Sequence, residues 1–174
     1  LAILDSDIVL ETDEETVASW REQAAPLPPL RAQVLAAAGR YEEAIVDYRA
    51  LLVDDPTNTQ AMRDLATMLI QTGEEQEGFQ VFEQLLQEPT LSGEDLYAIG
   101  VGFYQGSAYG RAANAFRMAG EKNRYDRDSI ELWARSLQLD SAYADVPEAA
   151  DHWIELDPSS VTAHLVLAQA VNAI

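Results

Sequence analysis

The stretch from Leu96 to Ala119, LYAIGVGFYQGSAYGRAANAFRMA, decides the fold. Small and apolar residues recur three and four positions apart on both sides of its central Gly-Ser pair, which is the spacing of amphipathic helices. A Gly-Ser pair between two such segments is typical of a tight turn. The stretch therefore predicts two helices that pack together, with these facing residues: Leu96, Ile99, Gly100, Phe103, Ala112, Phe116 and Ala119.

The same unit recurs every 34 residues without insertion. The first helix keeps a column of small residues, followed three positions later by a column of larger apolar ones. The turn and an aromatic column in the second helix repeat as well. These four columns consist of Ala32, Ala66, Gly100, Ala134 and Ala168; Leu35, Leu69, Phe103, Leu137 and Val171; Gly39, Gly73, Ser107 and Ser141; and Tyr48, Phe82, Phe116 and Ala150.

This pattern resembles the tetratricopeptide repeat family, whose 34-residue unit is a helix–turn–helix. The resemblance implies an all-α fold, a right-handed α-α superhelix (TPR solenoid). We expect four repeats plus one extra helix, over residues 25–58, 59–92, 93–126, 127–160 and 161–174. Residues 1–24 form an N-terminal extension, in which 12–24 predicts a helix that caps the first repeat.

Several positions depart from the repeat or mark helix boundaries. Prolines at 26, 28 and 29 predict that the first helix begins near Pro28 or Pro29. Ala150 replaces the aromatic residue of the fourth repeat, and Trp153 is expected to supply the missing bulk. Later helices should begin at Ser92, Asp128 and Ser160.

The resemblance also implies a concave groove lined by the first helix of each repeat, which would hold an extended or helical polypeptide. The third repeat is the least acidic of the four and is the predicted centre of contact. Exposed Tyr and Arg are favoured in binding surfaces. The predicted groove residues are Arg63, Thr67, Gln71, Tyr97, Val101, Tyr104, Gln105, Glu131, Arg135 and Gln138.

Composition limits the partners. The net charge of −19 repels phosphate backbones and anionic lipid, so we expect no nucleic-acid partner. No apolar run approaches the length that spans a membrane, so we expect no direct membrane insertion. The chain contains no cysteine, which excludes disulfides and thiolate metal sites. It begins at Leu1 and ends within a helical pattern, so it is expected to be part of something longer. Cytoplasmic and periplasmic locations both remain open.

No motif predicts catalysis, and we expect no catalytic residue, cofactor or metal site. Asp5 and Asp7 follow an apolar run and are similar to the nucleophile motif of haloacid-dehalogenase phosphatases. That chemistry also needs magnesium, a Lys and an α/β sheet, and the repeats are helical. Gly100 and Gly102 lie in a helical register rather than in a phosphate loop, and His152 and His164 have no third ligand near them.

The first hypothesis for function is therefore a protein- or peptide-binding scaffold or adaptor, part of a larger assembly. The matching positions lack the Lys, Asn and Arg of the carboxylate clamp found in chaperone-binding members. A second hypothesis is a self-associating or spacer segment of a larger, cell-envelope protein. A third is the non-catalytic repeat region of an enzyme.

Overall fold

The computed structural model describes residues 28–174, which form nine helices and no strand. Their bounds are α2 Pro28–Ala37, α3 Tyr41–Asp54, α4 Thr59–Gln71, α5 Glu75–Leu85, α6 Gly93–Gln105, α7 Tyr109–Lys122, α8 Arg127–Leu139, α9 Val146–Leu156 and α10 Val161–Ala173. α2 begins at Pro28, as the prolines predict. The helix expected at 12–24 lies outside the described residues.

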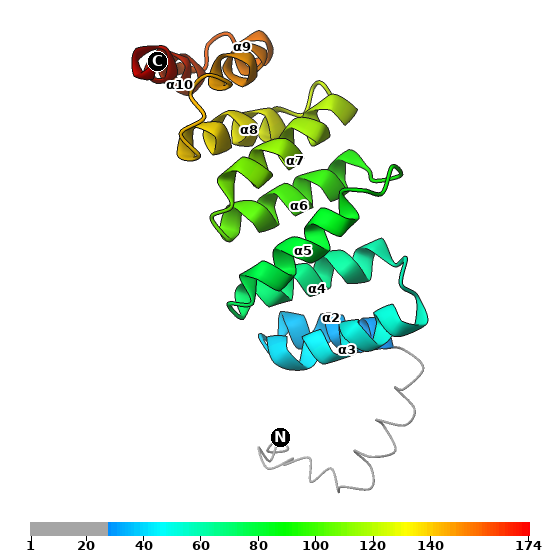
Figure 1. Cartoon of the computed structure of the whole chain (residues 1–174). Helices are drawn as coiled ribbons and strands as arrows, with labels where there is room; N and C mark the ends of the chain where they lie inside the picture. Colours follow the sequence, from blue (N-terminus) through cyan, green and yellow to red (C-terminus); the bar gives the residue numbers. More distant parts are fainter. Residues whose placement is uncertain (1–27) are drawn as a thin grey trace, which may run out of the picture.

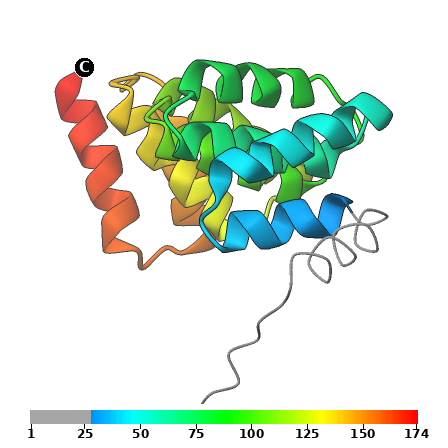
Figure 2. The ribbon, with the colours of Figure 1, turned by 90° about the horizontal axis from the view of Figure 1, so that it is seen from below.

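The helices stack in chain order from α2 to α10, as Figure 1 shows. Successive helices pack against each other, except that α5 and α6 meet mainly through the aromatic rings of Phe79, Phe82 and Phe103. In addition, α4 touches α6, and α8 touches α10. We call α2, α4, α6, α8 and α10 the first helices, and α3, α5, α7 and α9 the second helices. Viewed along the stack, α10 stands at its edge (Figure 2). The expected all-α superhelix of paired helices is confirmed.

The turns within the pairs place one residue each in the left-handed region of backbone space. The φ angles are +74° at Gly39, +88° at Gly73, 60° at Ser107 and 62° at Ser141. In each turn, the next residue donates its N–H to a carbonyl five residues earlier, as Ala108 does to Phe103 at 2.9 Å. This is the usual way to close a helix C-terminus, and glycine is the residue that adopts it without strain.

Capping side chains set where the first helices begin. Ser92 and Asp95 form a complete capping box at α6, and the Ser160 side chain caps α10, as expected. The expected start of α8 at Asp128 is wrong by two residues. The Asp126 carboxylate is the cap, because it accepts hydrogen bonds from the backbone N–H and the hydroxyl of Ser129.

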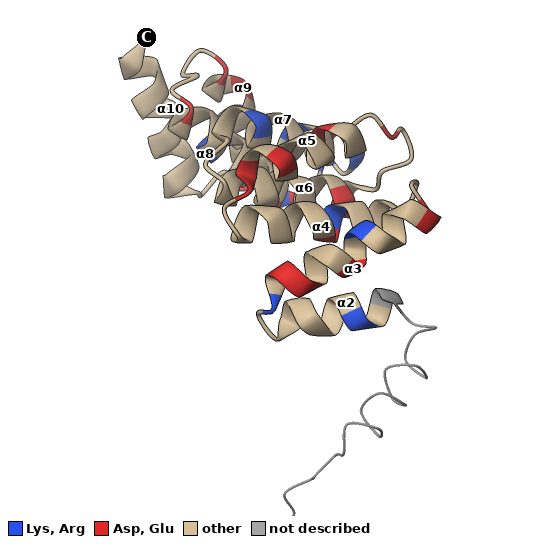
Figure 3. Ribbon diagram, turned by 60° about the horizontal axis from the view of Figure 1, so that its bottom comes forward, with Lys and Arg blue, Asp and Glu red and all other residues tan. Residues whose placement is uncertain are grey.

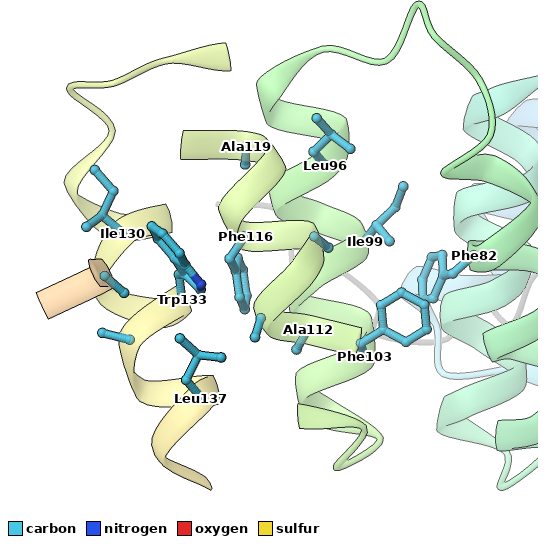
Figure 4. Packing of buried hydrophobic residues seen from close by; sticks show 14 of the residues in the cluster. Phe82, Leu96, Ile99, Phe103, Ala112, Phe116, Ala119, Ile130, Trp133 and Leu137 are labelled. Atoms are coloured by element: carbon cyan, nitrogen blue, oxygen red, sulfur yellow. The ribbon is translucent and has the colours of Figure 1, made fainter. Parts of the chain in front are cut away.

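The repeated columns form two core clusters, one around α2, α3 and α4 and a larger one that runs from α4 to α10, part of which is drawn in Figure 4. The Phe82 and Phe103 rings lie 5.3 Å apart, edge to face, and so join the second repeat to the third. At Gly100 the ring of Phe116 comes so close that an added Cβ would lie 2.7 Å from it. The small column therefore exists because a bulky side chain of the paired helix occupies the space above it.

The fourth repeat packs differently from the other three. Ala150 is fully buried, and Trp153, three residues further along α9, is 1% exposed. The expected compensation of one residue by the other is confirmed. In the first repeat, Arg31 of α2 is exposed, and its Nε lies 3.0 Å from Asp47 Oδ2 of α3.

Candidate functional site

The ten predicted groove residues lie on three consecutive first helices, α4, α6 and α8. None of these side chains is buried: Gln71, Gln105 and Arg135 are exposed and the other seven are half-buried. Ten partly exposed residues at equivalent places in three stacked helices form a surface that crosses the repeats. We call this surface, defined by these ten residues, the first-helix surface.

Polar side chains join α4 to α6 across this surface. Arg63 Nη1 lies 2.5 Å from Asp95 Oδ1, and Gln71 Nε2 donates to Gln105 Oε1 at 3.4 Å. Arg63 also donates to Gln60, and the Arg63 side chain is only 20% exposed. The guanidinium of Arg63 is therefore occupied within the fold, and it serves the joint between repeats.

Three side chains of α6 form an apolar stripe with two phenolic hydroxyls: Tyr97, Val101 and Tyr104. The Tyr97 ring lies 5.6 Å from that of Phe116, edge to face, and the Tyr104 ring lies 5.3 Å from that of Tyr109. Both tyrosines are thus held by α7 with one side toward solvent. Such rings offer contact area at a low entropic cost, because their position is already set.

A hollow of about 450 Å³ lies at the end of the stripe where α6 begins. It is lined by Gly93, Glu94, Tyr97, Asn123, Asp126 and Asp128. Burial, reinforced by the negative charges of Asp128 and Asp126, raises the pKa of the Tyr97 phenol. The carboxylates of Glu94, Asp126 and Asp128 make the lining of this hollow acidic.

On α8, Glu131 and Arg135 pair with each other at 2.7 Å. The Arg135 guanidinium carbon also lies 5.9 Å from the centre of the Trp153 ring, within the range of a cation–π contact. Gln138 donates to Gln169 of α10. Among the residues described, no hydrogen bond or ion pair joins the side chains of α6 to those of α8. The polar groups of the stripe are thus not bonded to the side chains of α8.

A larger hollow, of about 480 Å³, lies outside the predicted surface, between the second helices α7 and α9. Trp133 and His152 line it, and its rim carries ion pairs of Arg117 with Glu121 and of Arg124 with Glu155. Periodic columns predict which residues pack together, but they do not predict the gaps left between second helices. No sequence signal pointed to this hollow.

The other predicted features take structural positions. Gly100 lies inside α6, as expected. His164 is exposed at the stack's end, with Nε2 3.1 Å from the Pro158 carbonyl. Within residues 28–174 no three acidic or His side chains are arranged to hold a metal ion. No helix in that range is both long and apolar enough to cross a membrane. Asp5 and Asp7 lie outside the described residues.

Comparison with known proteins agrees with this architecture. Residues 35–92 match the model of a tetratricopeptide repeat family. The crystal structure of MamA superimposes with a TM-score of 0.63 at 18% identity, covering 81% of this chain and 82% of that one. The crystal structure of YrrB, "a TPR protein with an unusual peptide-binding site", gives 0.62 at 18% identity, covering 81% of this chain and 73% of that one. No curated protein matches the sequence.

At this level of identity the structural likeness shows the fold alone. The fold is that of a tetratricopeptide solenoid, the class of helical repeat scaffolds. By sequence, residues 35–92 match the tetratricopeptide repeat model, and the described residues outside that range continue the same helical pairing.

Proposed function

We propose that the chain is a protein-binding scaffold that holds a polypeptide on the first-helix surface, across α6 and α8. The observation that carries this proposal is the lack of bonds between Tyr97, Val101 and Tyr104 on α6 and Glu131 and Arg135 on α8, among the described residues, although all five side chains reach the surface. Elsewhere along the surface, side chains of neighbouring first helices bond to each other. On this stretch, rigid rings and a charged pair face solvent instead.

The ligand suited to this surface is an extended or helical segment that carries both apolar and basic residues. Apolar side chains would lie on the α6 stripe, where two held tyrosines supply contact area. A Lys or Arg would enter the hollow lined by Glu94, Asp126 and Asp128. A carboxylate or backbone carbonyl could accept from Arg135, whose side chain is 44% exposed.

A binding role agrees with the description of YrrB as a protein with a peptide-binding site. The binding role requires only a preformed surface, because each stacked pair fixes the position of the next. As part of the same proposal, the chain acts within a larger assembly.

The test is a random peptide library displayed against the chain, followed by affinity measurements on the recovered peptides. We expect peptides enriched in Lys or Arg beside aromatic and aliphatic residues. The double variant Tyr104→Ala, Arg135→Ala should weaken their binding at least about tenfold, as the loss of two anchor residues does, with unchanged helical circular dichroism.

The matched control is Tyr41→Ala, Arg40→Ala, which removes the same two residue types from the start of α3, away from the first-helix surface and from the acidic hollow. Binding should persist in this control and should weaken with added salt, because the hollow is acidic. Equal affinity for the double variant and the original chain would remove the assignment to this surface.

A further inference from the structure

Hollows lie between successive second helices at two places in the stack. One, of about 370 Å³, lies between α5 and α7, and the other is the hollow of about 480 Å³ between α7 and α9. The two occupy equivalent places in successive repeats, because residues that line the second follow residues that line the first by 34 positions: Leu86 and Gly120, Asn114 and Glu148, and Met118 and His152. The differences within these pairs show what is particular to the hollow between α7 and α9.

The first difference brings an aromatic ring into the hollow between α7 and α9. The Leu86 side chain lines the first hollow, whereas Gly120 at the equivalent place has no side chain. Trp133 of α8 lines the second hollow and is 8% exposed, whereas its counterpart Ile99 on α6 is 0% exposed. The wall of the second hollow therefore includes part of an indole ring, which is the aromatic surface best suited to a cation.

The second difference is a surplus of negative charge. The hollow between α5 and α7 has two charged lining residues, Glu83 and Arg111, which pair at 2.8 Å. In the hollow between α7 and α9 both arginines are paired with glutamates, whereas the carboxylates of Glu148 and Asp151 are exposed and form no ion pair among the described residues. The helix α9 that carries them contains no Lys or Arg, so it is drawn with red and no blue in Figure 3. This hollow therefore lacks the positive charge that balances the other one.

A guanidinium group matches this lining better than an ammonium group does. Its flat face can lie on the Trp133 ring while its N–H groups donate to carboxylates. The same fold places guanidinium groups over aromatic rings elsewhere, with Arg111 over Phe79 at 5.2 Å and Arg135 over Trp153 at 5.9 Å. An arginine side chain is therefore the ligand that the ring and the carboxylates favour together.

One residue of the hollow also has a polar atom without a partner. His152 lines the hollow, and its Nε2 atom is buried and forms no hydrogen bond. A buried polar atom that is left unpaired destabilises the fold. In the tautomer that carries its proton on Nδ1, the Nε2 atom accepts a hydrogen bond, and the N–H groups of a guanidinium can donate one. This atom is a reason to place a donor in the hollow that does not depend on the acidic residues.

We propose that the hollow between α7 and α9 binds an arginine side chain of a partner protein. The guanidinium group lies against the Trp133 ring, pairs with the carboxylates of Glu148 and Asp151, and donates to His152. The hollow is separate from the first-helix surface, so this proposal does not rest on the proposed function.

The probe is N-acetyl-arginine methylamide, added to the whole chain at constant ionic strength. N-acetyl-citrulline methylamide is the comparison, because it has nearly the same shape and no charge. The readouts are the NMR signals of the Trp133 indole N–H and the Gly120 amide, since both residues line the hollow. We expect both signals to shift and to saturate in about the millimolar range, the affinity of a ligand of this size. The citrulline compound should bind at least about tenfold more weakly, because it lacks the charge.

The double variant Glu148→Gln, Asp151→Asn should weaken binding of the arginine probe at least about tenfold, because it removes both unpaired carboxylates. The matched control is Asp54→Asn, Glu75→Gln, which removes two exposed carboxylates from α3 and α5 and so changes the net charge equally. This control should bind the probe as the original chain does. His152→Met, which copies the equivalent residue of the other hollow, should weaken binding about threefold or more. Circular dichroism checks that all the variants keep their helices.

Three results would overturn the proposal. The first is equal affinity of the arginine and citrulline compounds at the Trp133 and Gly120 signals. The second is an equal loss of binding in the double variant and in its control, because the attraction would then come from net charge alone. The third is a set of shifts confined to Tyr97 and its neighbours, because the probe would then occupy only the hollow where α6 begins.

Discussion

Arg63 on α4 and Asp95 on α6 form an ion pair between successive repeats, with Nη1 and Oδ1 2.5 Å apart. The same Asp95 carboxylate accepts hydrogen bonds from the backbone N–H and the hydroxyl of Ser92, and so completes the capping box. One side chain therefore both begins α6 and ties α6 to the helix before it.

Asp95→Asn should lower the free energy of unfolding by about 1–2 kcal/mol, the combined scale of a lost cap and a half-exposed ion pair. Urea denaturation monitored by circular dichroism measures this change. Glu94→Gln is the control, because Glu94 is exposed in the same turn, and it should change stability by less than about 0.5 kcal/mol. Equal effects of the two changes would contradict the double role of Asp95.

At low pH, the original chain and Asp95→Asn should have the same free energy of unfolding. The Ser92 hydroxyl, aided by the Ser92 backbone N–H and the charge of Arg63 and opposed by burial, holds the pKa of Asp95 below its ordinary 3.8. A carboxyl whose pKa is lowered by folding stabilises the fold above its unfolded pKa, and this contribution is lost as the pH falls through the folded pKa. The two urea midpoints should therefore differ fully at pH 6 and converge below about pH 4. Parallel curves down to pH 2 would contradict this.

Gly100→Ala should destabilise the chain although alanine favours helices, because the added Cβ meets the Phe116 ring. We expect a loss of about 1–3 kcal/mol, the usual cost of overpacking. Adding Phe116→Leu to Gly100→Ala should recover part of the loss. Gly93→Ala is the control, since a Cβ there lies 3.5 Å from its nearest neighbour, an ordinary contact. Thermal denaturation of the four chains tests the prediction.

Trp153→Ala should cost about 3–5 kcal/mol, the range for removing a large buried aromatic side chain. The cost should be high because Ala150 leaves no second aromatic in that helix to fill the space. The variant should also loosen Arg135, whose guanidinium lies over the Trp153 ring. Tyr125→Ala should barely change the free energy of unfolding, because Tyr125 is 81% exposed. Unfolding midpoints and the amide exchange of α8 provide the two measurements.

The fold was predictable because its columns repeat with the helical period. Phe103, Phe116 and Ala134 are core residues in the structure, as their places in the columns indicate. The start of α8 was missed because Asp126 and Asp128 are both suitable caps by type. The choice depends on the turn before them, where the Asp126 N–H donates to the Asn123 carbonyl at 3.0 Å.

For the candidate site, the sequence predicts which residues occupy equivalent positions in successive repeats, and no more. The 34-residue spacing identifies which residues of α4, α6 and α8 occupy equivalent positions, but not the bonds between their side chains. Arg63 and Asp95 are 32 residues apart, two short of the period, and they meet because a long guanidinium side chain leans along the stack. Arg63 therefore links two repeats and is largely covered. The Arg135 side chain, which contacts Glu131 and Trp153, is more exposed than that of Arg63.

The stacking of each helix mainly on its immediate neighbours has a mechanical consequence. Such a chain has no contact between its ends that a small bend would break, so strain is shared among all the interfaces between helices. We expect the stack to bend as an elastic rod. Cross-links tie α4 to α6 and α8 to α10, whereas the described residues form none between α6 and α8 or between α2 and α4, so bending at those two places would break no such link.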